Sequence, residues 1–530
     1  MILALAVLAV GEASLPAFVT PLVTLALVAC GVAMLCWYAR LPYLITLVVV
    51  GVAAGLLGLG GVRLSREAIL LLFLPPLLFE GSLHLPLSDL RRYATPVALL
   101  ALVGTLVTAG GVAALTHLLL GLPWQGALLL GVILAATDPV SVLALFKQLG
   151  APRGLRTLLE GESLFNDGIG IVLYIILLRV LDGGAASVAS VSADFLRIAL
   201  GGIGVGLAAG LLAYRLLAGV DDRQVEVMAS LVLAYGAYLG AESLHLSGIL
   251  AVVTAGLVVG SYATAHAMSA VTRVSMIGFW DQLAYLANSG LFLLMGARAA
   301  QALSWSVIPA VLVVFAVMML ARVPAVFGLI GVSNLVAARP ARVTRSWATV
   351  LWWGGVRGSI PVALALGLPS AWATSGGLAL DAVVFGVVIV SLVAQGLSVA
   401  PLMRRLGVGA PETLERDYEL ALAASASAGG SLGELDRLRE RREVSAEEFE
   451  RLRSRLEARR AAAETELGRL TGLSSALRGR REDAARERLV AAGKAAVSEV
   501  ARVGLIGEDA AREETRRLDD LLDASSNSNA

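Results

Sequence analysis

Residues 158–174 read LLEGESLFNDGIGIVLY, an apolar, glycine-rich stretch with acidic side chains at its centre. Drawn as a helix at about 100° per residue, it presents one small, polar stripe. This stripe contains Ser163, Asp167, Gly170 and Tyr174. Glu162 lies about 140° around from Asp167, beside Asn166, so it should face a neighbouring helix. We expect the stripe to line a cavity around Asp167, and Glu162 to have a structural pairing role.

The composition of the whole chain is that of a membrane protein. Of its 530 residues, 57% are hydrophobic, and the mean hydropathy is +0.80. A soluble protein cannot keep that much apolar surface away from water. The 56 glycines agree, because glycine lets membrane helices approach closely or open locally. We therefore expect an all-α membrane protein.

Apolar windows long enough to cross a bilayer recur throughout residues 1–405. A helical span needs about 20 mostly apolar residues to cross roughly 30 Å of hydrocarbon. Residues 1–10, MILALAVLAV, lack the basic start of a secretory signal and are interpreted as an apolar lead-in to the first span. Whether residues 1–20 belong to that span is left open. Thirteen windows qualify: 21–38, 41–60, 67–87, 95–120, 124–149, 155–181, 194–219, 226–244, 247–263, 279–300, 305–331, 345–369 and 380–405.

Basic residues between the windows select an orientation in the cell membrane. Cytoplasmic loops are enriched in Lys and Arg, and placing the N-terminus outside gives these loops most of the basic residues. The cytoplasmic set is Arg40, Arg91, Arg92, Lys147, Arg153, Arg156, Arg215, Arg223, Arg273, Arg339, Arg342, Arg345, Arg404 and Arg405. The opposite set is Arg63, Arg66, Arg179, Arg197 and Arg298. The odd number of spans then puts the C-terminus in the cytoplasm.

Residues 406–530 have the composition of a water-soluble tail. Half of the 42 Lys and Arg residues, and more than half of the 41 Asp and Glu residues, follow residue 405. Charges alternate in sign, as in EEFERLRSRLEARRAAAETELGRL at 447–470, which predicts solvated helices. Gly429, Gly430 and Gly472 are predicted breaks between these helices. We interpret this tail as helices that pack on one another or on a second copy, since no nucleotide, calcium or DNA motif indicates a sensor.

Six charged residues fall inside apolar windows, where they are costly. An ionised group at mid-bilayer costs on the order of 3 kcal/mol by insertion scales, so such groups pair with one another or face a water-filled pathway. Acids outnumber bases in this set, so two ion pairs leave two acids over. A transport pathway is therefore a better interpretation than buried structural pairs alone. The six are Glu80, Asp138, Glu162, Asp167, Arg322 and Arg357.

Two windows contain sequences that interrupt a helix. In LAATDPVSV, at 134–142, Pro139 has no N–H to give to the carbonyl of Ala135. Freed carbonyls there, with the oxygens of Thr137 and Asp138, are the ligands that a dehydrated alkali cation requires. Seven windows later WWGGVRGSIPVAL, at 352–364, repeats the interruption around Arg357. Broken helices at corresponding places predict two inverted repeats with the substrate site at their crossing, where Arg357 offsets the carbonyl ends of the half-helices.

Other kinds of chemistry have little support in the sequence. Cys30 and Cys36 are the only cysteines and suit neither a disulfide framework nor a zinc site. There is no HExxH motif and no phosphate-binding loop with a lysine. The histidines are interpreted as interfacial residues, so we expect neither an enzyme nor a cofactor. They are His84, His117, His245 and His266.

Between residues 40 and 405 the chain resembles the sodium/proton exchangers of the NhaP and NHE type. Five stretches carry this resemblance, in the same order as in that family. They are LPPLLFEGSLHL (74–85), ATDPVSVLALF (136–146), EGESLFNDGIGIVLY (160–174), ARVPAVFGLI (321–330) and GGVRGSIPVALAL (354–366).

The resemblance implies a role for each buried polar residue. Asp167 would bind the cation and the proton alternately, preceded by Asn166 as in the electroneutral branch. Thr137, Asp138 and Ser163 would complete the Na⁺ site. Glu80 matches an acid that in some prokaryotic members approaches the site through water, and Glu162 would pair with Arg322. The family fold implies a core of spans 4–6 and 11–13, a static dimerisation domain and a homodimer in the lipid bilayer.

Burial disfavours a charged carboxylate, so Na⁺ and H⁺ are expected to compete for Asp167. If the empty, ionised site cannot cross the low-dielectric barrier, only the loaded forms alternate, and exchange follows without ATP. Asn166 does not titrate, so the simplest count is one cation for one proton. Na⁺, Li⁺ and K⁺ ask for the same oxygen ligands, which leaves K⁺/H⁺ exchange as an alternative. A gated cation channel is a further alternative, against which the two broken helices argue. No nucleic-acid partner is expected.

Overall fold

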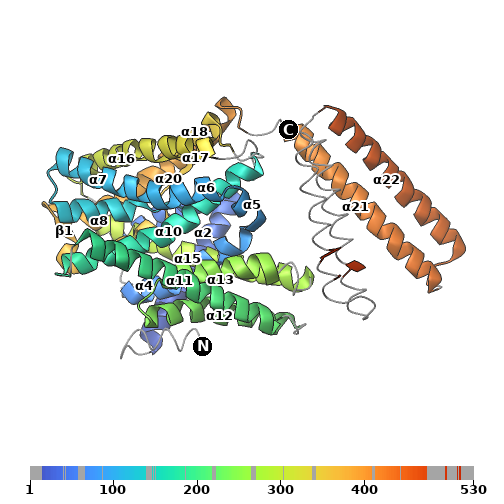
Figure 1. The fold of residues 1–530 in the computed structure, drawn as a ribbon, viewed down its shortest axis with the longest axis horizontal. Coiled ribbons are helices and arrows are strands. Elements are labelled where there is room, and N and C mark those ends of the chain that lie inside the picture. The colour runs from blue at the N-terminus through green and yellow to red at the C-terminus, as the bar shows by residue number, and fades with distance from the viewer. Residues whose placement is uncertain are drawn as a thin grey trace. The chain divides into compact units, whose positions relative to one another are not determined.

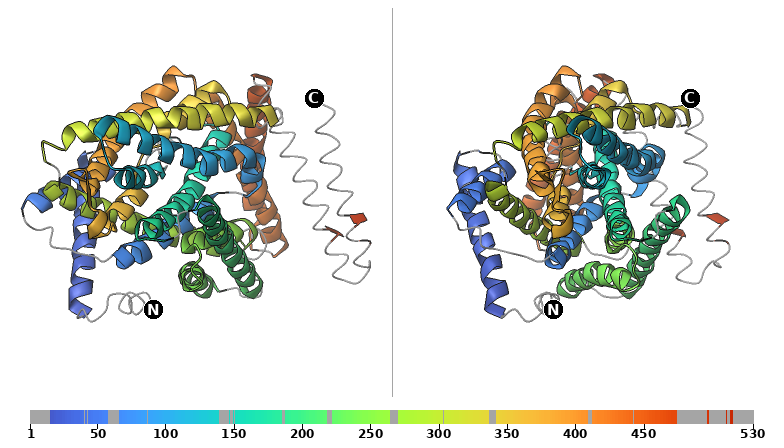
Figure 2. Two further views of the ribbon diagram at one scale, coloured as in Figure 1. Left: turned by 60° about the vertical axis from the view of Figure 1, so that its left-hand side comes forward. Right: turned by 90° about the vertical axis from the view of Figure 1, so that its left-hand side faces the viewer.

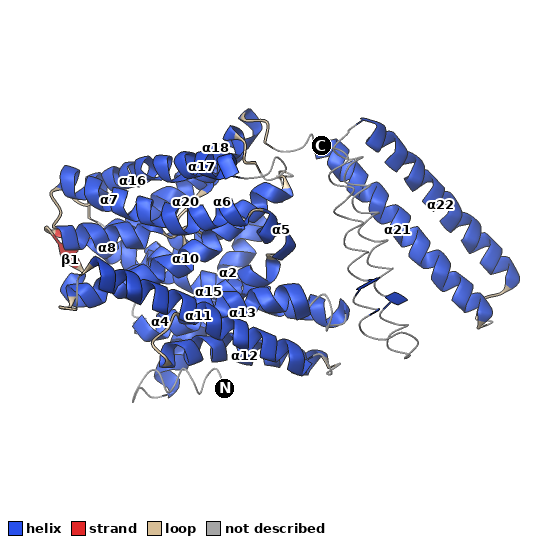
Figure 3. Ribbon diagram, viewed as in Figure 1, coloured by secondary structure: helices blue, strands red, loops and turns tan. Residues whose placement is uncertain are grey.

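The computed structural model describes most of the chain. The described residues are 15–39, 41, 43–57, 66–85, 87–138, 146, 149, 151–184, 187–217, 222–263, 270–302, 304–336, 342–408, 412–441, 443–473, 496, 497, 510, 513 and 514. Nearly all of them are helical, as the all-α prediction requires (Figure 3). Contacts divide the chain into two units, Met1–Gly409 and Ala410–Ala530.

The first unit is built almost entirely from helices (Figure 1). Three π-helical turns (η1 to η3) and one 3₁₀ turn (η5) interrupt or connect the α-helices. In order, the elements are α2 Leu15–Ala39, α3 Tyr43–Leu56, α4 Arg66–His84, α5 Leu87–Arg92, α6 Ala94–Ala98, η1 Leu99–Gly104, α7 Thr105–Leu120, α8 Trp124–Ala135, α10 Arg153–Leu181, α11 Val188–Leu217, α12 Arg223–Ser243, α13 Gly248–Val258, η2 Val259–Ala263, α15 Ala270–Ala302, α16 Ile308–Val323, η3 Pro324–Gly328, α17 Leu329–Val336, α18 Arg345–Gly354, α19 Ser359–Leu366, η5 Ser370–Trp372, β1 Thr374–Ser375, β2 Leu378–Ala379 and α20 Leu380–Arg405.

Each of the thirteen apolar windows contains helix in this structure. Seven helical segments are long and apolar enough to cross a membrane, and five shorter apolar helices accompany them among the described residues. The window at 345–369 holds the two short helices α18 and α19. Helix α2 begins at Leu15, so residues 15–20 do belong to the first helix. It lies at the edge of the unit in both views of Figure 2.

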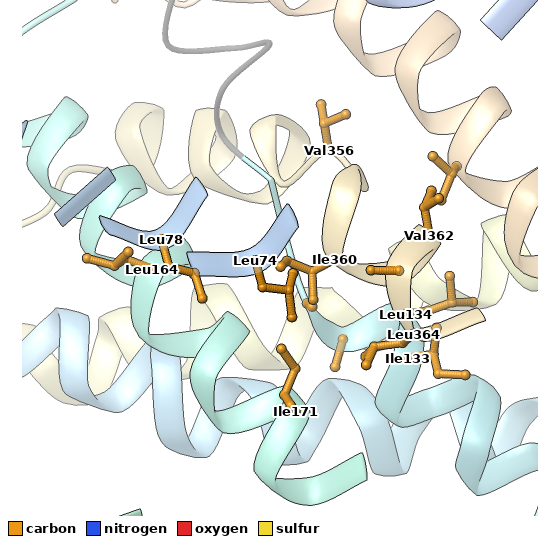
Figure 4. Close-up of a cluster of buried hydrophobic side chains, with 14 of the residues drawn as sticks. Leu74, Leu78, Ile133, Leu134, Leu164, Ile171, Val356, Ile360, Val362 and Leu364 are labelled. Carbon is orange, nitrogen blue, oxygen red and sulfur yellow. The ribbon is translucent and has the colours of Figure 1, made fainter. Parts of the chain in front are cut away.

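The helices that carry the charged motifs meet around α8, α10 and α19. Helix α7 packs against α8 and α16, and α20 packs against α16 and α19. Figure 4 shows the apolar contacts at this junction, with Ile133 and Leu134 of α8 near Leu364 of α19. Leu78 of α4 lies near Leu164 of α10, and Leu74 of α4 lies near Ile360 of α19 (Figure 4). The cluster is buried, so the charged residues that project into it are shielded from water.

The second unit contains a helical hairpin, α21 Glu412–Glu440 and α22 Ala446–Leu473. Buried Tyr418 and Ala421 of α21 pack with Leu467 and Leu470 of α22. Along the exposed face of α22, oppositely charged residues pair one turn apart, and a hydrogen bond from Arg469 lowers the pKa of the Glu466 carboxyl.

The predicted break at Gly429 and Gly430 is wrong, because α21 continues through both glycines. Glycine accepts a helical backbone at a cost of about 1 kcal/mol relative to alanine, and packing on α22 offsets that cost. The turn lies after Glu440 instead. There the Ser445 hydroxyl accepts the Glu448 N–H at 3.2 Å and the Glu448 carboxylate accepts the Ser445 N–H at 3.4 Å, which is a capping box. Gly472 lies in the last turn of α22.

Glycines let α3 and α15 approach closely. A methyl group on Gly51 would stand 2.5 Å from the Leu293 carbonyl oxygen and 3.0 Å from the Gly296 Cα. A methyl group on Gly296 would in turn meet the Val48 carbonyl oxygen. No side chain fits between the two backbones, so this contact depends on glycine at both positions.

Gly51→Ala is expected to separate α3 from α15 and to destabilise the protein by about 1–3 kcal/mol, the usual cost of overpacking. Thermal unfolding of the detergent-purified chain, followed by tryptophan fluorescence, measures the change. Gly236→Ala on α12 is the matched control, because a methyl group there meets nothing within 4 Å. Equal melting temperatures for Gly51→Ala and wild type would contradict this close contact.

Candidate functional site

The first interruption follows Ala135, where α8 ends and the backbone becomes extended at Ala136 (φ −62°, ψ 138°). Residues 136–138 are not helical, as Pro139 predicts, although 139–145 lie outside the described residues. The Asp138 N–H donates to the Val356 carbonyl oxygen at 2.8 Å instead of to its own helix. This bond joins the first interruption directly to the second.

The second interruption comprises residues 355–358, between α18 and α19. The Asp138 carboxylate accepts the Ser359 N–H at 3.0 Å and the Ser359 hydroxyl at 3.2 Å. A negative charge at a helix N-terminus is stabilised by the helix dipole. Gly358 is needed here, because a Cβ at that position would collide with the Asp138 carboxylate. Asp138 therefore caps α19 and ties the two interruptions together.

Arg357 neutralises the carbonyl end of α8. Its guanidinium is fully buried, and Nη1 donates to the carbonyl oxygens of Ala135 at 3.2 Å and Ala136 at 3.1 Å. Its Nε lies 3.1 Å from the Met318 sulfur. Arg357 was expected to offset both half-helices, but other groups serve the end of α18. One of them is Arg322, which donates to the Leu351 carbonyl at 3.2 Å.

Two side chains of α20 replace the backbone bond that is lost between α18 and α19. In a continuous helix the Arg357 N–H would donate to the Trp353 carbonyl. Here the Arg357 N–H donates to the Ser391 hydroxyl at 2.9 Å, which donates to the Gln395 side-chain oxygen. The Gln395 amide then donates to the Trp353 carbonyl at 2.7 Å. Both side chains are fully buried, so this chain of hydrogen bonds satisfies the break where water cannot.

Asn166 and Ser163 of α10 form hydrogen bonds with the non-helical residues that follow α8. The Asn166 side-chain oxygen accepts the Thr137 N–H at 3.2 Å, and its amide donates to the Thr137 hydroxyl at 2.9 Å. The Ser163 hydroxyl donates to the Thr137 carbonyl. On the same face, the Tyr174 hydroxyl lies 3.4 Å from the Leu364 carbonyl at the end of α19. The polar face of α10 thus packs against the first interruption and against the C-terminal end of α19.

Asp167 lies within this group, and one of its carboxylate oxygens lacks a hydrogen-bond donor among the described residues. The side chain is only 6% exposed, and among the described residues no donor reaches its Oδ1 atom. Asp138 and Arg357 are the charged neighbours that act on it electrostatically. A buried carboxylate oxygen without a donor is costly unless a proton or a cation occupies it. Asp167 therefore has the properties of a site for either.

Glu162 faces away from Asp167 and pairs with Arg322 of α16. The Arg322 Nη2 lies 2.6 Å from the Glu162 Oε1, and both side chains are buried. The guanidinium also packs against Gly355, where any Cβ would overlap it. Glu162, Asn166 and Arg322 line a small pocket that Asp167 does not line. Removing one member of such a buried pair leaves an uncompensated charge.

Glu80 contacts a different set of groups. It lies on α4, with its carboxylate 3.3 Å from His84 Nδ1, and His84 in turn lies beside Asp281 of α15. The structure therefore brings together Thr137, Asp138, Ser163, Asn166, Asp167 and Arg357, and it places Glu80 in a second cluster.

Three residues of this site were not predicted: Ser359, Ser391 and Gln395. Ser391 and Gln395 are polar residues four positions apart in the last apolar window, so they share one helical face. That spacing could have indicated from the sequence that the two residues act together. Their partners, however, lie on a segment some forty residues earlier, and a helical pattern alone does not identify them.

Comparison with known proteins identifies the family. The model of the sodium/hydrogen exchanger transmembrane domain matches residues 22–405. The chain belongs to the sodium/hydrogen exchanger family. This family consists of transporters and not of enzymes, and the match includes both interruptions and all of α10.

Relatives and a solved structure agree with the assignment. The low-affinity Na⁺/H⁺ antiporter NhaS1 of Synechocystis is 36% identical over 411 residues, which cover 77% of this chain and 78% of the relative. The Na⁺/H⁺ antiporter NhaP of Pseudomonas aeruginosa is 38% identical over 354 residues, covering 65% of this chain and 82% of the relative. The sodium proton antiporter MjNhaP1 from Methanocaldococcus jannaschii superposes with a TM-score of 0.59 at 22% identity, covering 77% of this chain and 99% of that one.

Gln395→Met is expected to destabilise the exchanger by about 1–3 kcal/mol, because it leaves the buried Trp353 carbonyl without its donor. Thermal unfolding in detergent measures this loss. Ser398→Ala is the control, since Ser398 binds the indole N–H of the same tryptophan at 2.8 Å but no backbone group of the break. A Gln395→Met protein as stable as Ser398→Ala would rule out a role for Gln395 in holding the interruption.

Proposed function

We propose that the chain exchanges Na⁺ for H⁺, with Asp167 as the group that binds the two ions in turn. The observation that carries this proposal is the orphaned Oδ1 atom of the buried Asp167 carboxylate. The names of the relatives, which are Na⁺/H⁺ antiporters, support it and favour Na⁺ over K⁺.

The charge balance around the interruptions supports a one-for-one exchange. Glu162 and Arg322 neutralise each other across a 2.6 Å contact. Asp138 and Asp167 then share the single positive charge of Arg357. One negative charge is left over when all five groups are ionised. One Na⁺ or one H⁺ neutralises this charge, whereas two ions bound together would leave the site with a net positive charge.

The same balance explains why exchange needs no other energy source. With Asp167 ionised and empty, the site holds a net charge in a medium of low dielectric constant, and movement across the barrier is expensive. With Na⁺ or H⁺ bound, the site is neutral and can change the side it faces. The gradient of one ion then drives the other.

Oxygen ligands for Na⁺ lie on two elements. Asp167 and Ser163 come from α10, and Thr137 comes from the end of α8. The Oδ2 atom of Asp138 is engaged by Ser359, so we assign Asp138 to holding α19 in place as well as to balancing charge. Asn166 positions Thr137 through two hydrogen bonds and adds no titratable proton.

We further propose the setting in which this exchange takes place. The distribution of Lys and Arg supports a cell-membrane protein with its N-terminus outside and residues 406–530 as a cytoplasmic tail. The transmembrane exchanger domain comprises residues 1–405. The resemblance to the NhaP and NHE type supports a homodimer and a transport core of spans 4–6 and 11–13.

The test is reconstitution into proteoliposomes with an internal pH-sensitive dye. An imposed Na⁺ gradient is expected to move protons through the wild type, and Asp167→Asn is expected to abolish that movement, because an amide cannot take up a proton. Asp182→Asn at the end of the same helix is the control, since the Asp182 side chain is exposed and accepts the Trp372 indole N–H at 3.3 Å, away from the interruptions.

Proton movement at the wild-type rate in Asp167→Asn would refute the assignment. The same vesicles, given K⁺ or Li⁺ gradients, decide the ion: a stronger response to K⁺ than to Na⁺ would replace Na⁺/H⁺ exchange by K⁺/H⁺ exchange.

A further inference from the structure

A second cluster of chemically reactive side chains lies where α4 ends against α15. Glu80 and His84 are one turn apart on α4, and Asp281 projects from α15. One ligand atom from each of the three lies within 4.8 Å of the others. Helices α4 and α15 pack directly against each other, so these positions are held by the fold (Figure 1).

The distances within this cluster are too long for tight ion pairs. His84 Nδ1 is 3.3 Å from the Glu80 carboxylate, and His84 Nε2 is 3.6 Å from Asp281 Oδ1. Charge-assisted hydrogen bonds between such groups are about 2.7–2.9 Å long. Both contacts are within ion-pair distance, with the Glu80 carboxylate beside Nδ1 and the Asp281 carboxylate beside Nε2.

The orientation of the His84 ring explains the gap. Nδ1 lies 3.0 Å from the Glu80 carbonyl oxygen, to which the Nδ1–H donates. In the neutral ring this leaves a lone pair on Nε2, directed at the Asp281 carboxylate. Two acceptors that face each other need a cation or a proton between them. A ring N–H held by a backbone carbonyl is also the usual way in which a metal-ligating histidine is oriented.

We infer that Glu80, His84 and Asp281 form a binding site for a divalent transition-metal ion of the Zn²⁺ type, which links α4 to α15. Tetrahedral zinc with bonds of about 2.0–2.2 Å keeps its donor atoms about 3.4 Å apart, close to the separation of His84 Nε2 and Asp281 Oδ1. Imidazole nitrogen and carboxylate oxygen both ligate zinc, and a water would complete four-coordination.

The partial exposure of these side chains suits an exchangeable ion. The Glu80, His84 and Asp281 side chains are 24%, 32% and 51% exposed in the isolated chain, so the fold itself does not enclose them. Mg²⁺ does not fit, because it prefers six oxygen ligands and retains its waters. The site is separate from Asp167 and does not depend on the transport assignment.

Calorimetric titration of the full-length, detergent-purified chain with Zn²⁺ at neutral pH tests this inference. We expect one saturable site per chain, and a higher melting temperature with Zn²⁺ than with equimolar Mg²⁺, because an ion that binds only the folded state stabilises it. His84→Gln and Asp281→Asn are each expected to weaken binding by about tenfold or more, since even the loss of outer-shell partners costs about 10–100-fold.

His117→Gln is the matched control, because His117 stacks on Trp124, away from this cluster. It should bind Zn²⁺ as the wild type does. Absence of saturable binding, or equal affinities in wild type, His84→Gln and Asp281→Asn, would overturn the site. Since this readout is binding, its failure leaves Na⁺/H⁺ exchange untouched, and failure of exchange leaves the metal site untouched.

Discussion

The buried imbalance of one charge at the crossing of two interrupted helices is the constraint on which the rest of the structure depends. Among the described residues around the interruptions, three carboxylates share two guanidinium groups. The one negative charge that is left without a partner is costly in an apolar interior. In the proposed mechanism, this cost makes Asp167 sensitive to small cations and prevents the empty site from changing the side it faces.

A second constraint follows from the first. Helices must be interrupted for carbonyl oxygens and a carboxylate to converge, and each interruption leaves backbone groups without partners. Backbone bonds satisfy some of these groups, as between the Asp138 N–H and the Val356 carbonyl, and side chains from other elements satisfy others. Arg357 serves the end of α8, Asp138 the start of α19, and Gln395 the end of α18.

The sequence predicted the parts of this arrangement that depend on periodicity or on proline. The angle between Glu162 and Asp167 follows from helical geometry, and the structure does place the two on different sides of α10. Pro139 predicts the end of α8 near Ala135. The thirteen windows follow from hydropathy alone, because lipid leaves few alternatives to apolar helices.

Contacts between distant segments could not be predicted in the same way. The cap of Asp138 on Ser359 joins residues 221 positions apart, and neither local pattern contains the other. Glu80 was grouped with Asp167 by resemblance, whereas its neighbours are decided by how α4 meets α15. The predicted break at Gly429 and Gly430 is wrong because local helix propensity is weak compared with the packing of α21 on α22.

The most direct test of the central claim is whether Na⁺ displaces a proton from the purified chain. Adding Na⁺ to the detergent-solubilised protein in weak buffer, with a pH indicator present, measures protons released per Na⁺ bound. A single shared carboxylate predicts about one proton for each Na⁺, and none from Asp167→Asn. Binding of Na⁺ to the wild type without proton release would contradict competition at Asp167.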